Sequence, residues 1–290
     1  MHKFLRSIGF SKVNDLDDQD VLLKDVLSHH DYKRVVETKD NHLFAEISKE
    51  FAPDMGITVC GEYDSDNLFH MEYYYPFYWG SRPVSYDSVA VDPHIATTSF
   101  AGACEDMRIG TTLIFYVTDA GEYMAAVENG VTEDHMNSVS FSALAEEGTI
   151  LLPVCEDQKA GSGDAQGAEL NSLFEAAQSG DQEAIRSLTK ADLELMASLT
   201  HRIQHEDIYT IVDSYFTPYG MECDLYSVMG DIQDVNVVSN HATDERIYQI
   251  SISSNGLPVD VCINEADLTG VPEVGRRFKG FVWLQGRINF

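Results

Sequence analysis

The chain has 290 residues, with 48 Asp and Glu against 19 Lys and Arg, so its formal net charge is −29. Nucleic acids and anionic lipid surfaces bind proteins mainly through Lys and Arg, so this charge excludes both classes of partner for the body of the chain. Because 44% of the residues are hydrophobic, the composition still predicts a folded protein with a sizeable core rather than a disordered acidic chain.

The first predicted element is a helix over residues 16–29. Asp15 precedes a first turn rich in carboxylates, which the helix dipole favours, and Leu22, Leu23 and Val26 then follow at helical spacing. The residues before this helix contain Arg6 and no long apolar run, unlike a secretory signal. No later stretch has the roughly 18 apolar residues of a membrane span. We therefore expect a soluble, cytoplasmic protein.

Residues 43–154 favour β-strands. Short runs rich in β-branched and aromatic residues alternate with Gly, Pro, Asp and Asn, which are typical of turns. The predicted strands are 43–51, 57–63, 69–79, 84–91, 111–118 and 149–154. Together with the first helix they predict an α+β domain over residues 1–156, built on an antiparallel-rich sheet.

The middle of the chain predicts a linker followed by helices. Residues 157–168 (DQKAGSGDAQGA) hold three Gly, three Ala and no large apolar side chain, a composition typical of a flexible connection. Apolar residues then recur at helical spacing and predict a short helical segment over residues 169–207.

The last part of the chain, residues 208–290, favours strands again. The predicted strands are 208–216, 225–232, 247–253, 259–263 and 278–288. The dipeptide Asn255-Gly256 is typical of a two-residue hairpin turn. Five short strands in this range predict a small β-barrel-like C-terminal module, with an OB-like barrel as the candidate topology.

The run MEYYYPFYW (71–79) is the most unusual local feature. On a strand, one face would carry Tyr73, Tyr75 and Phe77, and the other mostly Tyr74, Tyr78 and Trp79. Pro76 between them predicts an edge strand or a bulge, because proline cannot donate to the ladder. One face could belong to the core and the other to a flat ligand or partner surface. The alternative is an interdomain or dimer seam.

His201 and His205 are the candidate metal ligands. They lie four residues apart on the predicted helix, so both imidazoles could face one ion. The sequence between them, HRIQH, lacks the glutamate of the H-E-x-x-H motif, so a solvated helix end is the alternative. No phosphate-binding or dinucleotide-binding glycine motif occurs in the chain, and we expect no cofactor.

The five cysteines predict reduced thiols rather than a disulfide framework. Their number is odd, and they are widely spaced with no C-x-x-C pair. Cys104, close to His94, is a candidate nucleophile, with a buried strand thiol as the alternative. The carboxylates beside Cys104, Cys155 and Cys223 argue against a reactive thiolate, because neighbouring negative charge raises a thiol pKa.

The two ends of the chain are basic although its body is acidic. Residues 1–13 and 276–290 contain no Asp or Glu, and their bases are Lys3, Arg6, Lys12, Arg276, Arg277, Lys279 and Arg287. We expect these side chains to lie against acidic surface and to hold the ends in place.

Three blocks carry a resemblance to a known group of proteins. They are MHKFLRSIGFSK (1–12), EDIYTIVDSYFTPYGMECDLYSVMGDI (206–232) and GRRFKGFVWLQGRI (275–288). On these blocks the chain resembles a family of uncharacterised proteins, a domain of unknown function, from anaerobic Firmicutes. The resemblance implies a cytoplasmic protein without an assigned activity and supplies no catalytic residues.

The sequence leaves three hypotheses for function. The favoured one is a non-enzymatic binding or regulatory module that contacts an unknown protein or small molecule through the aromatic run. The second is a metal-assisted hydrolase that uses His201 and His205. The third is a structural protein in which the aromatic run forms the interface of a homo-oligomer.

Overall fold

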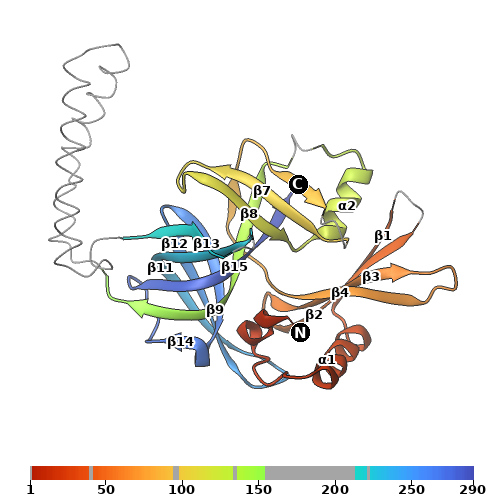
Figure 1. The fold of residues 1–290 in the computed structure, drawn as a ribbon, viewed down its shortest axis with the longest axis horizontal. Helices are drawn as coiled ribbons and strands as arrows, with labels where there is room; N and C mark the ends of the chain where they lie inside the picture. The colour runs from red at the N-terminus through yellow and green to blue at the C-terminus, as the bar shows by residue number, and fades with distance from the viewer. Residues whose placement is uncertain (1, 39–41, 94–97, 133–135, 154–212, 221–222) are drawn as a thin grey trace, which may run out of the picture. The chain divides into compact units, whose positions relative to one another are not determined.

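The computed structural model describes residues 2–38, 42–93, 98–132, 136–153, 213–220 and 223–290. The chain divides into two compact units, one comprising Met1–Leu151 and Ser214–Phe290 and the other Leu152–Asp213. Figure 1 shows the first unit as two β-sheets with short helices. The predicted linker (157–168) and helical segment (169–207) lie outside the described residues.

Strands dominate the described residues, with 56% in strands and 14% in helices, so the predicted α+β class describes this mostly β protein only roughly. The helices are α1 (Leu16–Ser28) and α2 (Ala120–Glu128), with two 3-10 turns, η1 (Lys3–Ile8) and η4 (Glu265–Asp267). The predicted first helix is confirmed. Its N-cap is Asp15, whose carboxylate accepts the backbone N–H of Asp18 at 2.8 Å.

The small sheet is antiparallel throughout, as predicted for this part of the chain. Its order is β1-β2-β3-β4, with β1 (Tyr32–Glu37), β2 (Leu43–Ala52), β3 (Met55–Tyr63) and β4 (Phe69–Tyr78). Strands β2 to β4 match the predicted runs to within two residues. Strand β1 was not predicted, because five of its six side chains are exposed and give no alternating apolar pattern.

Strand β4 is the edge of the small sheet, as Pro76 predicts. A bulge interrupts its pairing with β3 between Cys60 and Gly61. Within the described residues, no strand of the small sheet pairs with the outer side of β4, and two of its backbone groups there are bonded instead by one side chain from the large sheet. Gln285 accepts the N–H of Tyr78 at 3.1 Å and donates to the carbonyl of Pro76 at 2.8 Å.

The large sheet contains eleven strands. The path runs β10-β11-β12-β13-β9-β15-β8-β7-β6, and β5 and β14 pair with β9. Their bounds are β5 (Pro83–Ser85), β6 (Ala90–Pro93), β7 (Phe100–Asp106), β8 (Thr111–Val117), β9 (Ser138–Leu151), β10 (Tyr215–Pro218), β11 (Leu225–Ser239), β12 (Arg246–Ser254), β13 (Leu257–Asn264), β14 (Leu268–Thr269) and β15 (Arg277–Asn289).

The large sheet as a whole is mixed and is not a closed barrel, which corrects the predicted C-terminal module. Strand β9, from the first half of the chain, lies between β13 and β15 and pairs with both. Strand β15 also pairs with β11, which links β11, β12, β13, β9 and β15 in a ring, but this ring needs β9 from outside residues 208–290, and the sheet continues from β15 into β8, β7 and β6. Residues 1–151 and 214–290 therefore contribute strands to one sheet and fall in one compact unit.

Two predicted strands have different bounds in the structure. The predicted strand 84–91 is two short strands, β5 and β6, and the predicted strand 149–154 is the end of the longer β9. The hairpin turn between β12 and β13 is confirmed. Asn255 and Gly256 have φ of 50° and 82°, the left-handed values that this turn requires.

Two hydrophobic clusters form the core. One lies within the large sheet around Phe115, Phe141 and Phe278. The other packs the small sheet and the N-terminal helices against the large sheet, with Phe44 and Trp283 among its members. The small sheet is therefore held to the large one by burial of apolar surface as well as by Gln285.

The basic ends lie against carboxylates, as predicted for four of their side chains. The ion pairs are Lys3–Glu146 at 3.6 Å, Arg6–Asp267 at 2.5 Å, Arg276–Glu273 at 2.8 Å and Arg287–Glu122 at 3.4 Å. The C-terminal segment is also a central strand, because β15 pairs with β8, β9 and β11. Within the described ranges, no helix combines the length and apolar character needed to cross a bilayer.

Candidate functional site

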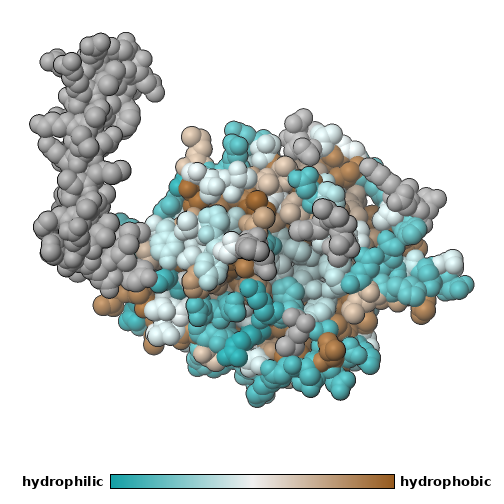
Figure 2. Space-filling model, in the orientation of Figure 1, coloured by the Kyte–Doolittle hydropathy of each residue, from teal (hydrophilic) through white to brown (hydrophobic). Residues whose placement is uncertain are grey.

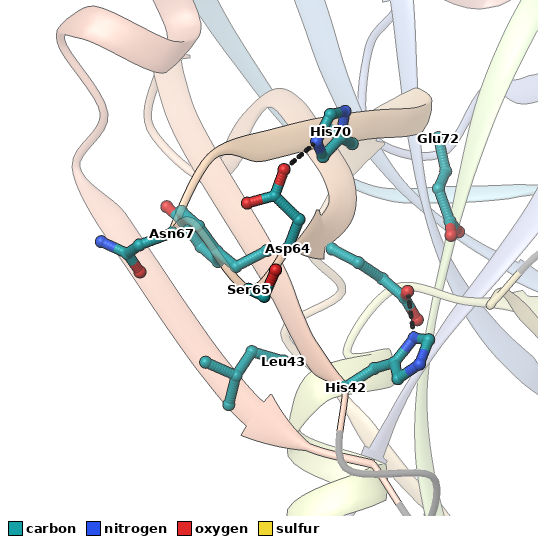
Figure 3. Close-up of a pocket in the computed structure, with 9 residues that line it drawn as sticks. His42, Leu43, Asp64, Ser65, Asn67, His70 and Glu72 are labelled. Atoms are coloured by element: carbon teal, nitrogen blue, oxygen red, sulfur yellow. Dashed lines mark hydrogen bonds and ion pairs between the residues drawn. The ribbon is translucent and has the colours of Figure 1, made fainter.

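The tip of the small sheet contains a pocket of about 840 Å³, which we call the tip pocket. Its lining residues are His42, Leu43, Glu62, Tyr63, Asp64, Ser65, Asn67, His70 and Glu72. They come from the start of β2, the end of β3, the β3–β4 turn and the start of β4 (Figure 3). In Figure 2 the β3–β4 end of the small sheet is covered by hydrophilic residues.

The first polar pair of the tip pocket joins β2 to β3. His42 lies two residues before Phe44, so both side chains leave the same face, and Phe44 is paired with Glu62. The His42 Nδ1 atom consequently lies 2.8 Å from the Glu62 carboxylate. This contact depends on the strand register, and local sequence gives no sign of it.

The second polar pair lies at the β3–β4 turn. His70 Nε2 is 2.7 Å from Asp64 Oδ2, while Asp64 Oδ1 accepts the N–H groups of Asp66 and Leu68. The hydrogen bond from His70 and those from the turn stabilise the ionised carboxylate and lower the pKa of Asp64. Asp64 is thus occupied by the turn, which Asn67 completes with a φ of 61°.

Glu72 provides the third carboxylate of the pocket. It lies beside the β3–β4 bulge, and its Oε2 accepts the hydroxyl of Thr98 at 2.7 Å. Figure 3 shows Glu72 and His42 on the same side of the pocket. Among the described residues, no hydrogen-bond donor contacts Oε1 of Glu62 or Oε1 of Glu72. Two carboxylate oxygens can therefore accept donors from a ligand.

The aromatic run lies mostly inside the protein, beyond the tip pocket. Tyr75, Phe77 and Tyr78 are buried, with 1%, 0% and 8% of their surface exposed. Tyr73, Tyr74 and Trp79 are half-buried. These six side chains do not form the exposed surface that the sequence suggested. They pack in a seam between the two sheets of one compact unit, and the predicted interdomain or dimer seam remains a prediction.

The tyrosines of this seam are fixed by hydrogen bonds and ring contacts. Tyr73 donates to the carbonyl of Thr98 at 2.9 Å, and Tyr74 donates to Gln19 at 2.8 Å. Tyr75 contacts Tyr116 of β8 with ring centroids 4.9 Å apart. Burial raises the pKa of Tyr73, Tyr75 and Tyr78 far above its ordinary value, so these phenols stay protonated.

The predicted metal ligands lie outside the described residues, which do not include His201 or His205. Among the residues that are described, no group of three or more His, Cys, Asp or Glu side chains has an arrangement that could hold a metal ion. The two imidazoles of the tip pocket are each paired with their own carboxylate. The metal-assisted hydrolase and the homo-oligomer remain predictions.

The described cysteines are free thiols, as predicted, and most of them are buried. Burial raises the pKa of the Cys104 thiol to about 12, with a smaller contribution from Asp106. Burial likewise raises the pKa of Cys60 and of Cys262. These three thiols are protonated at neutral pH and are poor nucleophiles. Cys155 and the possible partner His94 of Cys104 lie outside the described residues.

The tip pocket was missed because its residues are scattered and individually ordinary. The turn sequence Asp64-Ser65-Asp66-Asn67 marks the β3–β4 loop, and this is the one local signal. Cross-strand pairing then brings His42, Glu62 and His70 to neighbouring positions.

Comparison with known proteins places the chain in one family. No curated protein matches the chain. No solved structure matches it either. A family model described as a domain of unknown function from E. rectale, DUF3881, matches residues 5–286. The match covers almost the whole chain and confirms the family resemblance carried by the three sequence blocks. The chain belongs to the DUF3881 family.

Proposed function

We propose that the protein is a non-enzymatic binding module whose tip pocket takes a small cationic ligand such as an alkyl amine. The observation that carries the proposal is the charge of the lining. Three carboxylates line the pocket, and none of its described lining residues is Lys or Arg. The volume of about 840 Å³ falls within the range of small-molecule sites, which is roughly 300–1,000 Å³.

Glu62 and Glu72 are the side chains that would contact the ligand. Each has one oxygen engaged with a protein donor, and the other can accept a hydrogen bond from an ammonium group. Asp64 contributes negative charge but is held by the turn. Because Glu62 is 30% exposed, water and salt screen its charge, and we expect binding to weaken as ionic strength rises.

The net charge of −29 supports the same ligand class but creates a competing explanation. A strongly acidic protein attracts any cation to its surface without a dedicated site. The experiment must therefore change the pocket and the remaining surface by the same number of charges.

Isothermal titration calorimetry with spermidine as the probe and succinate as the anionic comparison tests the proposal. We expect Glu62→Gln with Glu72→Gln to weaken spermidine binding at least about tenfold, or about 1.4 kcal/mol. The matched control is Glu128→Gln with Asp234→Asn, which removes two exposed carboxylates elsewhere. Equal weakening in both double variants would show general surface attraction, and absence of amine binding at low salt would overturn the proposal.

A further inference from the structure

The strongest structural anomaly outside the tip pocket is a pair of buried carboxylates at the inner part of the small sheet. Glu46 of β2 and Asp119 at the N-terminus of α2 are 9% and 8% exposed. Burial of a carboxylate without a cation in contact is unfavourable, because water no longer solvates the charge. Such groups therefore require an explanation.

The Glu46 side chain caps α2, which comes from another part of the chain. Its Oε2 accepts the N–H of Gly121 at 2.8 Å, at the first turn of α2. The residue in the N-cap position, Asp119, makes no capping bond with its own side chain. Asp119 instead accepts the N–H of Ile288, in β15, at 3.2 Å. The turn of residues 118–121 is thus held from the small sheet on one side and from the large sheet on the other.

Tyr75 shows which protonation state this arrangement requires. Its hydroxyl lies 3.0 Å from the carbonyl of Thr118 and 3.4 Å from Glu46 Oε1. A phenol has one proton and cannot donate it to both oxygens. The shorter contact takes that proton, which leaves a lone pair of Tyr75 facing Glu46. A proton on Glu46 makes this second contact a hydrogen bond, and an ionised Glu46 competes with Thr118 for the phenol proton.

The other ionisable groups near Glu46 offset its charge only in part, because Arg34, its cross-strand partner, is also paired with Glu122. Arg34 of β1 and Arg287 of β15 both pair with Glu122 of α2, at 3.6 and 3.4 Å. The groups that face Glu46 from β3, β4 and β8 are neutral when protonated, and they are Cys60, Tyr73 and Tyr116. Asp119 adds like charge when it ionises.

Desolvation sets the direction of the pKa shifts. It raises the pKa of Glu46 to about 7, and the N–H of Gly121 and the charge of Arg34 offset part of this effect. Desolvation, followed by the charge of Glu46, raises the pKa of Asp119 well above its ordinary range.

We propose that Glu46, Tyr75 and the turn of residues 118–121 form a proton-controlled contact between the small sheet and α2. The contact is closed when Glu46 carries a proton. When Glu46 ionises, Tyr75 turns its proton from the Thr118 carbonyl to the carboxylate, so β4 releases Thr118 at the entry to α2, while the Gly121 N–H stays bonded to the carboxylate. The inference does not depend on a ligand in the tip pocket, because these residues are not part of its lining.

Hydrogen exchange of the full chain at pH 6 and pH 8, corrected for the intrinsic pH dependence of exchange, tests the proposal. With a group that titrates near pH 7, the closed form falls about tenfold over this interval, so protection of the Thr118 N–H, which is bonded to the Gly286 carbonyl, should fall about tenfold, while protection of the Gly121 N–H should not fall. In Glu46→Gln, the amide can donate to Tyr75 at any pH. This variant should keep the pH 6 protection at pH 8.

Two further samples make the result decisive. Glu128→Gln, an exposed position at the end of α2, should behave as the unchanged protein does. Tyr75→Phe cannot switch acceptors and should lose the pH dependence. If Glu46→Gln does not fold, carbon-13 NMR of the unchanged protein replaces it, and a glutamate carboxyl that titrates near pH 7 is expected. A pH-independent protection of Thr118, equal pH dependence in Glu46→Gln, or no glutamate titrating above pH 6 would overturn the proposal.

Discussion

The exposed tip and the buried middle of the small sheet use carboxylates in opposite ways. At the tip, Asp64 is exposed, hydrogen-bonded to His70 and to backbone N–H groups, and its pKa is lowered. In the middle of β2, Glu46 is buried beside a phenol and a helix terminus, and its pKa is raised to about 7. The two carboxylates lie on neighbouring strands or turns of one sheet. Access to water and to hydrogen-bond donors, rather than residue type, decides which form is stable.

Deletion of the C-terminal strand should have the largest effect, because this strand supplies the large-sheet contacts of the small sheet and of Asp119. Deletion of residues 276–290 removes β15, which pairs with β8, β9 and β11 and supplies Gln285 and Ile288. We expect this variant to show no cooperative thermal transition by circular dichroism. Removal of Phe290 alone, which is 48% exposed, is the control and should leave Tm unchanged. A folded deletion variant would contradict the central role of β15.

Gln285→Ala separates the two sheets at one side chain. The substitution leaves the buried N–H of Tyr78 and the carbonyl of Pro76 without partners. Each orphaned group costs about 1–3 kcal/mol, so we expect the free energy of unfolding to fall by about 4 kcal/mol. Urea denaturation measures this loss, and Gln233→Ala, at an exposed position, should cost much less. Similar losses in both variants would show that the bridge contributes little.

Glu46→Gln tests whether the buried Glu46 makes the stability of the protein depend on pH. The folded pKa of about 7 exceeds the ordinary value of 4.5, so the folded state binds more protons between these pH values, and stability falls as pH rises through that window. At pH 8 the variant avoids this loss and should be more stable than the unchanged protein by roughly 3 kcal/mol. At pH 4 the difference should vanish. Urea denaturation at both pH values checks the result, and an equal difference at both would contradict it.

Asp64→Asn tests the tip and should have the smallest effect. The lowered pKa of Asp64 contributes stability above the pKa of the unfolded chain, and this contribution is lost as pH falls through the folded pKa. Because the carboxylate is exposed and solvated, we expect no measurable change in Tm at neutral pH. Asparagine keeps an acceptor for the N–H groups of Asp66 and Leu68. A change in the free energy of unfolding at pH 8 as large as that expected for Glu46→Gln would remove the contrast between the exposed tip and the buried Glu46.

Local sequence was sufficient for elements whose pattern is set by neighbours along the chain. The first helix, strands β2 to β4, the hairpin turn at Asn255-Gly256 and the edge position of β4 all follow from periodicity, turn residues or a missing N–H. Strand β1 escaped prediction because its side chains are mostly exposed. The tip pocket escaped because its residues meet through strand register.

The sequence by itself determined the acidic character, the family, the strand-rich composition and the pairing of basic ends with acidic surface, because charge and hydrophobic period are properties of neighbouring residues. Tertiary structure alone decided that β9 lies between β13 and β15, and so joined two predicted domains into one sheet. It also decided that the aromatic run is a seam and that Glu46 is buried at a helix terminus. These outcomes depend on contacts between residues far apart in the chain, which local propensity does not encode.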